Sequence, residues 1–198
     1  MNENLFLWGG IWLLWCLVTF FMGKSIQRTY YGIGLLLLSI CVPYTLELSG
    51  ILFPMSLIFL LLYSFLGLVL FPLKLKKYLL ILLFAYLYVI YFLWRFTSPI
   101  FDDSWFVTLA IVFSTVVFMF VEKQFQSKIL MWCTSLAIGH TLYTFICWSY
   151  YLQYNINFQH FYNIFVGVIV LFTIQHFWKT FMHKVDVLLQ VIESKKVS

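Results

Sequence analysis

The sequence predicts an all-α, polytopic transmembrane helix bundle with seven spans, followed by a C-terminal amphipathic cytoplasmic helix. Of its 198 residues, 64% are hydrophobic and 10% are charged, against about 45–50% and about 25% in ordinary soluble domains. So few charged side chains cannot cover the surface of a soluble protein of this size. The apolar runs lack the ten-residue alternation of a transmembrane β-barrel, so helices are expected.

Apolar runs between charged residues define the seven expected spans. A helix needs about 20 apolar residues to cross a hydrocarbon core about 30 Å thick. The expected spans lie near residues 5–22, 30–46, 51–71, 78–94, 105–121, 129–151 and 161–178. Residues 1–178 therefore form the transmembrane domain, and residues 179–198 form a cytoplasmic tail.

The second and third spans are the least regular, because Pro43 and Pro54 interrupt them and only four residues separate them. The alternative is one span followed by a re-entrant segment. Cytoplasmic loops of membrane proteins collect Lys and Arg, and a merged span would place Lys24 and Arg28 on the opposite face from the cluster at 74–77. The charge pattern therefore favours two separate spans.

With seven spans, eleven of the twelve basic residues fall on one side of the membrane. They are Lys24, Arg28, Lys74, Lys76, Lys77, Lys123, Lys128, Lys179, Lys184, Lys195 and Lys196. The other side receives Arg95 together with Glu3, Glu47, Asp102 and Asp103. We therefore expect the N-terminus outside and the C-terminus in the cytoplasm.

The tail has the pattern of an amphipathic helix with a 3.6-residue period. Its apolar positions are Phe181, Met182, Val185, Leu188, Leu189 and Ile192, and its polar positions include Lys184, Asp186, Gln190, Glu193 and Lys195. Such a helix either lies on the cytoplasmic leaflet, which is the simpler expectation, or pairs with a partner helix.

The expected partners are the lipid bilayer and, through residues 179–198, a membrane or cytoplasmic protein. The formal net charge is +5, but the cations are spread along one membrane face. Attraction to anionic lipid headgroups accounts for this distribution, so we expect no nucleic acid to bind.

The sixth expected span carries the most polar strip. From His140, the residues Thr144, Cys147 and Tyr151 follow at i+4, i+7 and i+11 on one face. This strip, with Glu47 near the outer mouth, could line a path for a solute or a proton. The structural alternative is a buried histidine that joins two helices.

Motifs for catalysis, metal binding and cofactor binding are not found in the sequence. The four cysteines form no C-x-x-C pair, and neither G-x-S-x-G nor H-E-x-x-H occurs. No Asp, Glu, Lys or Arg falls in the middle third of an expected span. We therefore expect no enzyme, no cofactor and no catalytic or metal site.

The N-terminal run places Trp8, Trp12 and Trp15 on one helix face. Glu3 stands where a signal peptide carries basic residues, so we expect this span to be retained. Together with Thr19-Phe20-Phe21-Met22-Gly23-Lys24, the run resembles the opening of the YphA-type small membrane proteins of spore-forming Gram-positive bacteria. The resemblance implies a multi-pass protein of the bacterial cell membrane, without an assigned activity and connected with forming the spore envelope.

Two functions are compatible with these features. The first is a non-enzymatic membrane scaffold or assembly factor, whose contacts are the helix faces and the tail. The alternative is a small-solute transporter, or the substrate-binding subunit of one, lined by the polar strip. A hydrated cavity along the strip would favour transport, and a dry seam would favour the scaffold.

Overall fold

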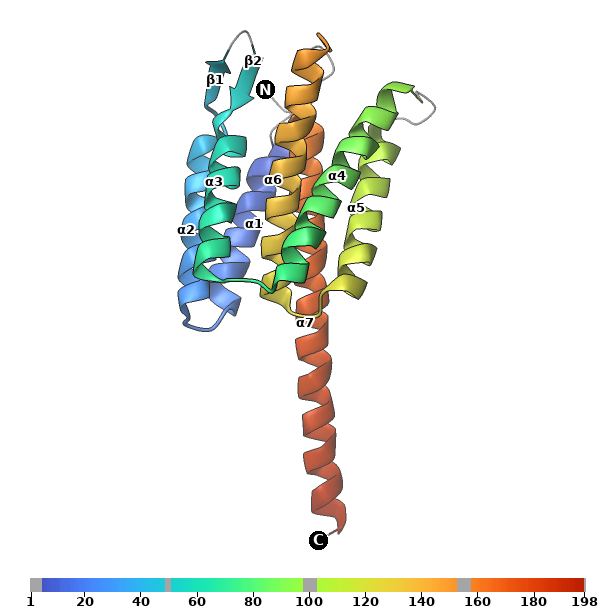
Figure 1. Ribbon diagram of the computed structural model, residues 1–198. Helices are drawn as coiled ribbons and strands as arrows, with labels where there is room; N and C mark the ends of the chain where they lie inside the picture. Colours follow the sequence, from blue (N-terminus) through green and yellow to red (C-terminus); the bar gives the residue numbers. More distant parts are fainter. Residues whose placement is uncertain (1–4, 49–50, 98–102, 153–157, 198) are drawn as a thin grey trace.

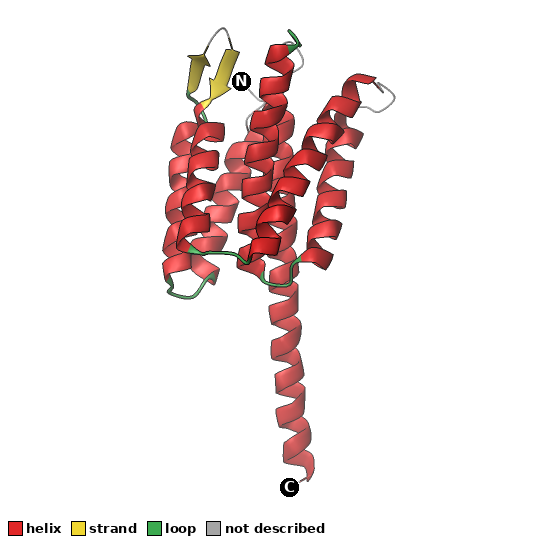
Figure 2. Cartoon of the chain, in the orientation of Figure 1, coloured by secondary structure: helices red, strands yellow, loops and turns green. Residues whose placement is uncertain are grey.

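The computed structural model describes residues 5–48, 51–97, 103–152 and 158–197, and this part of the chain is a bundle of seven helices with one β-hairpin (Figures 1 and 2). About 86% of the structure is helical, as expected for an all-α membrane protein. The elements are α1 (Leu5–Phe21), α2 (Ile26–Cys41), β1 (Thr45–Leu48), β2 (Ile51–Pro54), α3 (Met55–Leu70), α4 (Leu75–Thr97), α5 (Asp103–Val121), α6 (Phe125–Ser149) and α7 (Phe158–Val197).

Five of the helices form a ring. Contacts run from α1 to α2, from α2 to α3, from α3 to α6, from α6 to α7, and from α7 back to α1. The other two helices pack on the outside of this ring, with α4 on α6 and α5 on α7 (Figure 1). A hydrogen bond of 2.7 Å from the Tyr91 hydroxyl to the Phe106 carbonyl joins α4 to α5.

Helix α6 is the most buried of the helices long enough to span a membrane. Its hydroxyl side chains are satisfied within the helix, since Thr134 and Ser135 donate to the carbonyls four residues earlier, each at 2.7 Å. Gly139 lets α4 come close, because a Cβ at this position would lie 2.9 Å from the backbone oxygen of Ala85. Small residues at helix contacts are typical of membrane bundles.

The hairpin lies between α2 and α3, where only a short loop was expected. Its antiparallel register pairs Glu47 with Leu52 and Thr45 with Pro54. Proline cannot continue a helix, so α2 ends before Pro43 and α3 begins directly after Pro54, which is its N-cap. The last residues of the expected span 30–46 therefore lie in β1, and the first residues of the expected span 51–71 lie in β2.

The helix α6 is shifted against the expected span at 129–151. It begins four residues earlier, at Phe125, and ends at Ser149. Tyr151 has a left-handed backbone with a φ of 58°, a conformation that ends helices.

Four helical segments are long and apolar enough to cross a membrane, among the described residues: Leu75–Arg95, Ser104–Val121, Phe125–Ser149 and Phe158–Val187. The helices α1 and α3 contain shorter apolar stretches, Leu7–Phe20 and Met55–Leu70. Large apolar side chains also cover the outside of the bundle, including Leu62 (64% exposed) and Phe113 (64% exposed). Lipid is the solvent that suits such a surface.

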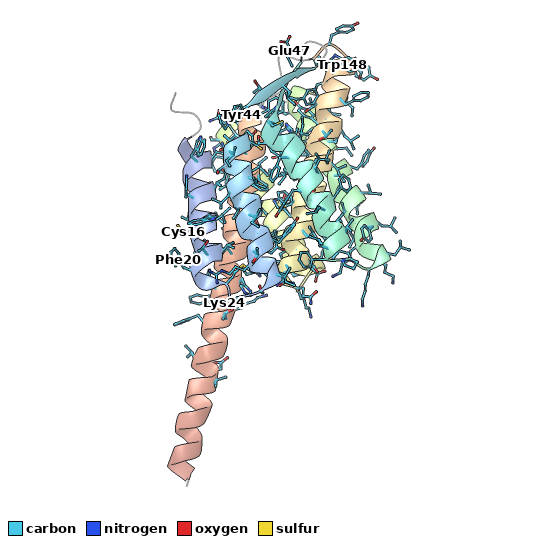
Figure 3. All side chains as sticks on the ribbon, turned by 90° about the vertical axis from the view of Figure 1, so that its left-hand side faces the viewer. Cys16, Phe20, Lys24, Tyr44, Glu47 and Trp148 are labelled. Carbon is cyan, nitrogen blue, oxygen red and sulfur yellow. The ribbon has the colours of Figure 1, made fainter. Side chains whose placement is uncertain are left out.

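The basic residues gather at one end of the bundle. Consecutive helices run in opposite directions, so the α1–α2, α3–α4 and α5–α6 connections share that end (Figure 1). Lys24 lies there, whereas Glu47 and Trp148 lie at the opposite end (Figure 3). We call the first the cation end; it carries Lys24, Arg28, Lys74, Lys76, Lys77, Lys123 and Lys128.

Helix α7 is a single helix of 40 residues that leaves the bundle at the cation end and continues along its own axis (Figure 1). The expected tail at 179–198 is therefore not a separate element up to Val197. It continues the seventh helix without a break.

Candidate functional site

The polar strip of α6 lies in the closed interior of the bundle. His140 is completely buried, and its Nδ1 lies 2.9 Å from the hydroxyl of Tyr88 on α4. Aromatic rings surround the imidazole, with ring centroids at 4.6 Å for Phe161 and 5.3 Å for Phe158. Among the residues that the structure describes, none is a hydrogen-bond partner of its Nε2, which faces the surrounding aromatic rings.

The structure brings together only part of the predicted strip. Thr144 and Cys147 are fully buried on the C-terminal side of His140, and the Thr144 hydroxyl donates to the His140 carbonyl at 2.8 Å. Tyr151 lies beyond the end of α6 and is 84% exposed. Glu47 is exposed on β1. His140 of α6 thus contacts Tyr88 of α4 and Phe161 of α7, which is the kind of helix contact that the structural alternative describes.

A cavity of about 440 Å³ lies inside the five-helix ring and reaches the cation end. We call it the ring cavity. It is lined by residues of all five ring helices: Leu14, Leu17 and Val18 of α1, with Met22 directly after it; Tyr30, Tyr31, Gly34, Leu35 and Leu38 of α2; Phe59, Leu60, Tyr63 and Ser64 of α3; Phe125, Gln126, Ile129, Leu130 and Cys133 of α6; and Phe165, Ile169, Thr173, His176, Phe177 and Thr180 of α7. Gly23, Lys24 and Ser25 of the α1–α2 turn complete it.

Two tyrosines hold one wall of the ring cavity together. The hydroxyl of Tyr30 donates to the Tyr63 carbonyl and the hydroxyl of Tyr63 donates to the Tyr30 carbonyl, each at 2.6 Å. Their rings are stacked with centroids 4.5 Å apart. Glycines make room for them, because a Cβ at Gly34 would lie 2.5 Å from the Tyr63 ring and one at Gly67 would lie 2.4 Å from the Tyr30 oxygen.

The mouth of the ring cavity is polar. Ser25 caps α2 by accepting a hydrogen bond of 3.2 Å from the Arg28 backbone N–H, and Gln126 donates to the side chain of Gln27. On α7, the His176 ring stacks on Phe125 with a centroid distance of 4.3 Å. Toward the opposite end of the ring, beyond the lining residues, the buried hydroxyls of Ser56 on α3 and Tyr162 on α7 are hydrogen bonded.

Two further cations of this end are held by the fold. Lys128 is 3% exposed, and its Nζ donates to Gln175 Oε1 of α7 at 3.1 Å and lies 5.2 Å from the Phe172 ring centroid. Lys77 Nζ lies 2.5 Å from Glu122 Oε2. Partial burial acts to raise the pKa of Glu122, but the hydrogen bonds from Lys77 and the Gln124 N–H outweigh it, so that this pKa is lowered.

Comparison with known proteins identifies the family. The model of the YphA-like integral membrane protein family matches residues 2–198, which is nearly the whole chain. The chain belongs to this family. No curated protein and no solved structure matches it. The resemblance seen in the N-terminal span is therefore confirmed, and the protein is an integral membrane protein.

In this YphA-like protein the polar groups of the ring cavity come from segments far apart in the sequence. Tyr30 and Tyr63 were not singled out by the sequence analysis, because a tyrosine in an apolar helix is usual near a membrane interface. Lys24 and Lys128 were interpreted only as part of the charge pattern that sets the topology and attracts anionic lipid headgroups. Gly34 and Gly67 make room for these tyrosines, but which tyrosine each glycine accommodates is known only once the helices are paired.

Proposed function

We propose that this YphA-like protein crosses a bacterial cell membrane seven times, with its N-terminus outside and its C-terminus in the cytoplasm. Four segments of sufficient length, two shorter apolar helices and the apolar outer surface support this proposal. Helix α2, with 16 residues, is not among these apolar segments. Its place in the ring, beside α1 and α3, supports its inclusion.

We further propose that the protein is a non-enzymatic membrane scaffold or assembly factor that holds a partner helix through α7. One observation carries this proposal: α7 does not break where it leaves the bundle, and it extends straight from the cation end (Figures 1 and 3). A helix that lay on the leaflet would have to bend near Lys179. A straight extension instead presents its side chains to the cytoplasm.

The apolar stripe of this extension supports a helical partner. Phe181 is 59% exposed and Met182 is 41% exposed, and the apolar positions continue at Val185, Leu188 and Ile192 with spacings of three and four residues. Such a stripe is the seam of a helix pair. Leaving this apolar stripe exposed to water costs about 25 cal/mol of free energy per Å² relative to burying it. The pattern therefore favours a second helix packed against the stripe.

The test is capture of partners from membranes solubilised in mild detergent. The full chain is compared with a chain that lacks residues 179–198 and with a Phe181→Ser/Val185→Ser variant. Asp186→Ser, on the polar face of the same helix, is the matched control. We expect one defined partner to be retained by the full chain and the control, and to be lost from the other two. Equal recovery from all four proteins would contradict the proposal.

A small-solute transporter, or the substrate-binding subunit of one, is the second candidate, and the ring cavity is the observation that favours it. Its volume of about 440 Å³ lies within the range of about 300–1,000 Å³ for ligand pockets. The cavity is not the predicted strip, because His140, Thr144 and Cys147 are absent from its lining. Thermal stabilisation of the purified protein by a panel of polar solutes tests this candidate, and stabilisation lost in a Ser64→Phe variant would support it.

A role in forming the spore envelope comes only from the resemblance and stays a prediction. Deleting the gene in a spore-forming host and scoring the heat resistance of the spores tests it. Full resistance would contradict the prediction.

A further inference from the structure

We propose that the ring cavity binds one acyl chain of an anionic membrane lipid, with the phosphate of the headgroup at Lys24 beside the mouth. Most of the cavity lining is apolar, and a charged side chain, Lys24, lies where the cavity reaches the cation end. Neither the family nor the scaffold function assigns a ligand to it, and the proposal does not depend on the partner of α7.

The inside of the cavity suits an acyl chain, because its polar groups are already used by the protein. The hydroxyls of Tyr30 and Tyr63 donate to each other's backbone. Ser64 donates to the Leu61 carbonyl at 2.9 Å and Thr173 to the Ile169 carbonyl at 2.8 Å. A polar solute would lose its hydrogen bonds to water without gaining these four hydroxyls as donors. A hydrocarbon chain loses none.

The depth of the cavity also suits an acyl chain. Its lining on α2 extends from the turn at Ser25 to Leu38, and a helix rises about 1.5 Å per residue, so the lined length is roughly 20 Å. One leaflet of a hydrocarbon core that is about 30 Å thick is about 15 Å deep. The cavity therefore has the length of a lipid chain that enters from the interface.

The mouth has the charge for an anionic headgroup. The described residues that line the ring cavity include Lys24 and contain no Asp or Glu. A second hollow of about 330 Å³, lined by α1, α2 and the turn between them, shares Lys24 and Ser25 with the ring cavity and adds Arg28. Two cations thus flank the turn from which the chain would enter, and Lys and Arg are the side chains that bind phosphate groups.

The first experiment locates the chain. The full-length protein is placed in phosphatidylcholine nanodiscs that contain a phosphatidylglycerol probe with a photoreactive group at the end of one acyl chain, and the labelled peptides are sequenced. We expect labels on the lining residues farthest from the mouth, around Leu38 of α2, Phe59 of α3 and Cys133 of α6. Labels confined to outward positions such as Leu62 would overturn the proposal, because they report only the surrounding lipid.

Two substitutions on α3 separate the cavity from the outer surface. Ser64→Phe fills the cavity from a lining position, whereas Leu62→Phe adds the same ring at a position 64% exposed on the outside. We expect Ser64→Phe to abolish the inward labels and Leu62→Phe to keep them. Inward labels that persist in a folded Ser64→Phe protein would overturn the proposal.

A charge reversal at the exposed mouth tests the headgroup without disturbing the core. The full-length protein is analysed by native mass spectrometry after exchange into mixed phosphatidylglycerol and phosphatidylcholine. We expect Lys24→Glu to lower the preference for phosphatidylglycerol by at least about fivefold, while Lys74→Glu, at the same end but outside the cavity, preserves it. An unchanged preference in Lys24→Glu would overturn the headgroup assignment. Displacement of the bound lipid by glycerol phosphate would also overturn the proposal, in favour of a water-soluble phosphate ligand.

Discussion

Tyr30 of α2 and Tyr63 of α3 donate their hydroxyl protons to each other's backbone carbonyls at 2.6 Å in both directions. The two hydrogen bonds cross a helix contact on the wall of the ring cavity. Because α2 and α3 are both short and joined by a β-hairpin, this pair fixes their relative height at a point well away from the hairpin.

Removing either hydroxyl should loosen this contact. We predict that Tyr30→Phe and Tyr63→Phe each lower the free energy of unfolding by about 0.6–1.7 kcal/mol, the range measured for hydrogen bonds between membrane helices. A phenylalanine ring can keep the stacking between positions 30 and 63, so the expected loss of stability is that of one hydroxyl hydrogen bond. Thermal unfolding in detergent checks this, with Tyr86→Phe, an exposed tyrosine of α4, as the control. An equal loss of unfolding free energy in Tyr86→Phe would contradict this explanation.

The glycine beside this pair should not tolerate a side chain. We predict that Gly34→Ala destabilises the protein by about 1–3 kcal/mol, because its Cβ would lie 2.5 Å from the Tyr63 ring. Gly9→Ala is the matched control, since nothing lies within 4 Å of its Cβ. Alanine favours a helix over glycine by up to about 1 kcal/mol, so the control should be neutral or stabilising. Equal destabilisation of both variants would refute the packing argument.

The His140–Tyr88 hydrogen bond should act as a helix contact. We predict that Tyr88→Phe lowers the free energy of unfolding by about 1–3 kcal/mol, because it leaves Nδ1 of a completely buried imidazole without a partner. In a His140→Phe background, the same Tyr88→Phe change should cost clearly less. A double-mutant cycle by thermal unfolding measures the difference. Additive losses would show that the two side chains are not coupled.

The Glu122–Lys77 ion pair should make stability depend on pH at the cation end. The pKa of Glu122 is lowered in the folded protein, so the stabilisation is fully present above the carboxyl group's ordinary pKa and is lost as the pH falls through the lowered value. Between about pH 7 and about pH 3, we predict that the difference in unfolding temperature between the parent and Glu122→Gln is constant down to the ordinary pKa of the carboxyl group and shrinks below it. A constant difference between the two proteins over this range would contradict the assignment.

Patterns in the sequence predicted the order and direction of the helices better than they predicted which side chains are in contact. The spacing of the cations predicted that Lys24, Lys76 and Lys123 share one end of the bundle. When successive helices run in opposite directions, every second connection lies at the same end, whatever the packing of the helices. Pro43 and Pro54 predicted interruptions, although four-residue strands are too short to show a two-residue period, so the hairpin was missed.

The candidate site could be predicted only in part. His140, Thr144 and Cys147 were expected on one face and do share the interior, yet whether that face lines a cavity depends on the rings of α4 and α7 that close over it. The ring cavity depends on contacts such as Tyr30 with Tyr63, which join residues 33 positions apart. A single sequence contains no signal for such a pairing.

The most direct test of the account is the sidedness of the two bundle ends. In a cysteine-free background, Glu47→Cys and Lys76→Cys are treated in intact cells with a thiol reagent that cannot cross the membrane. The account predicts that Glu47→Cys is labelled at once and that Lys76→Cys is labelled only after the cells are permeabilised. Labelling of Lys76→Cys from outside intact cells would contradict the seven-span arrangement and the cytoplasmic position of the α7 extension.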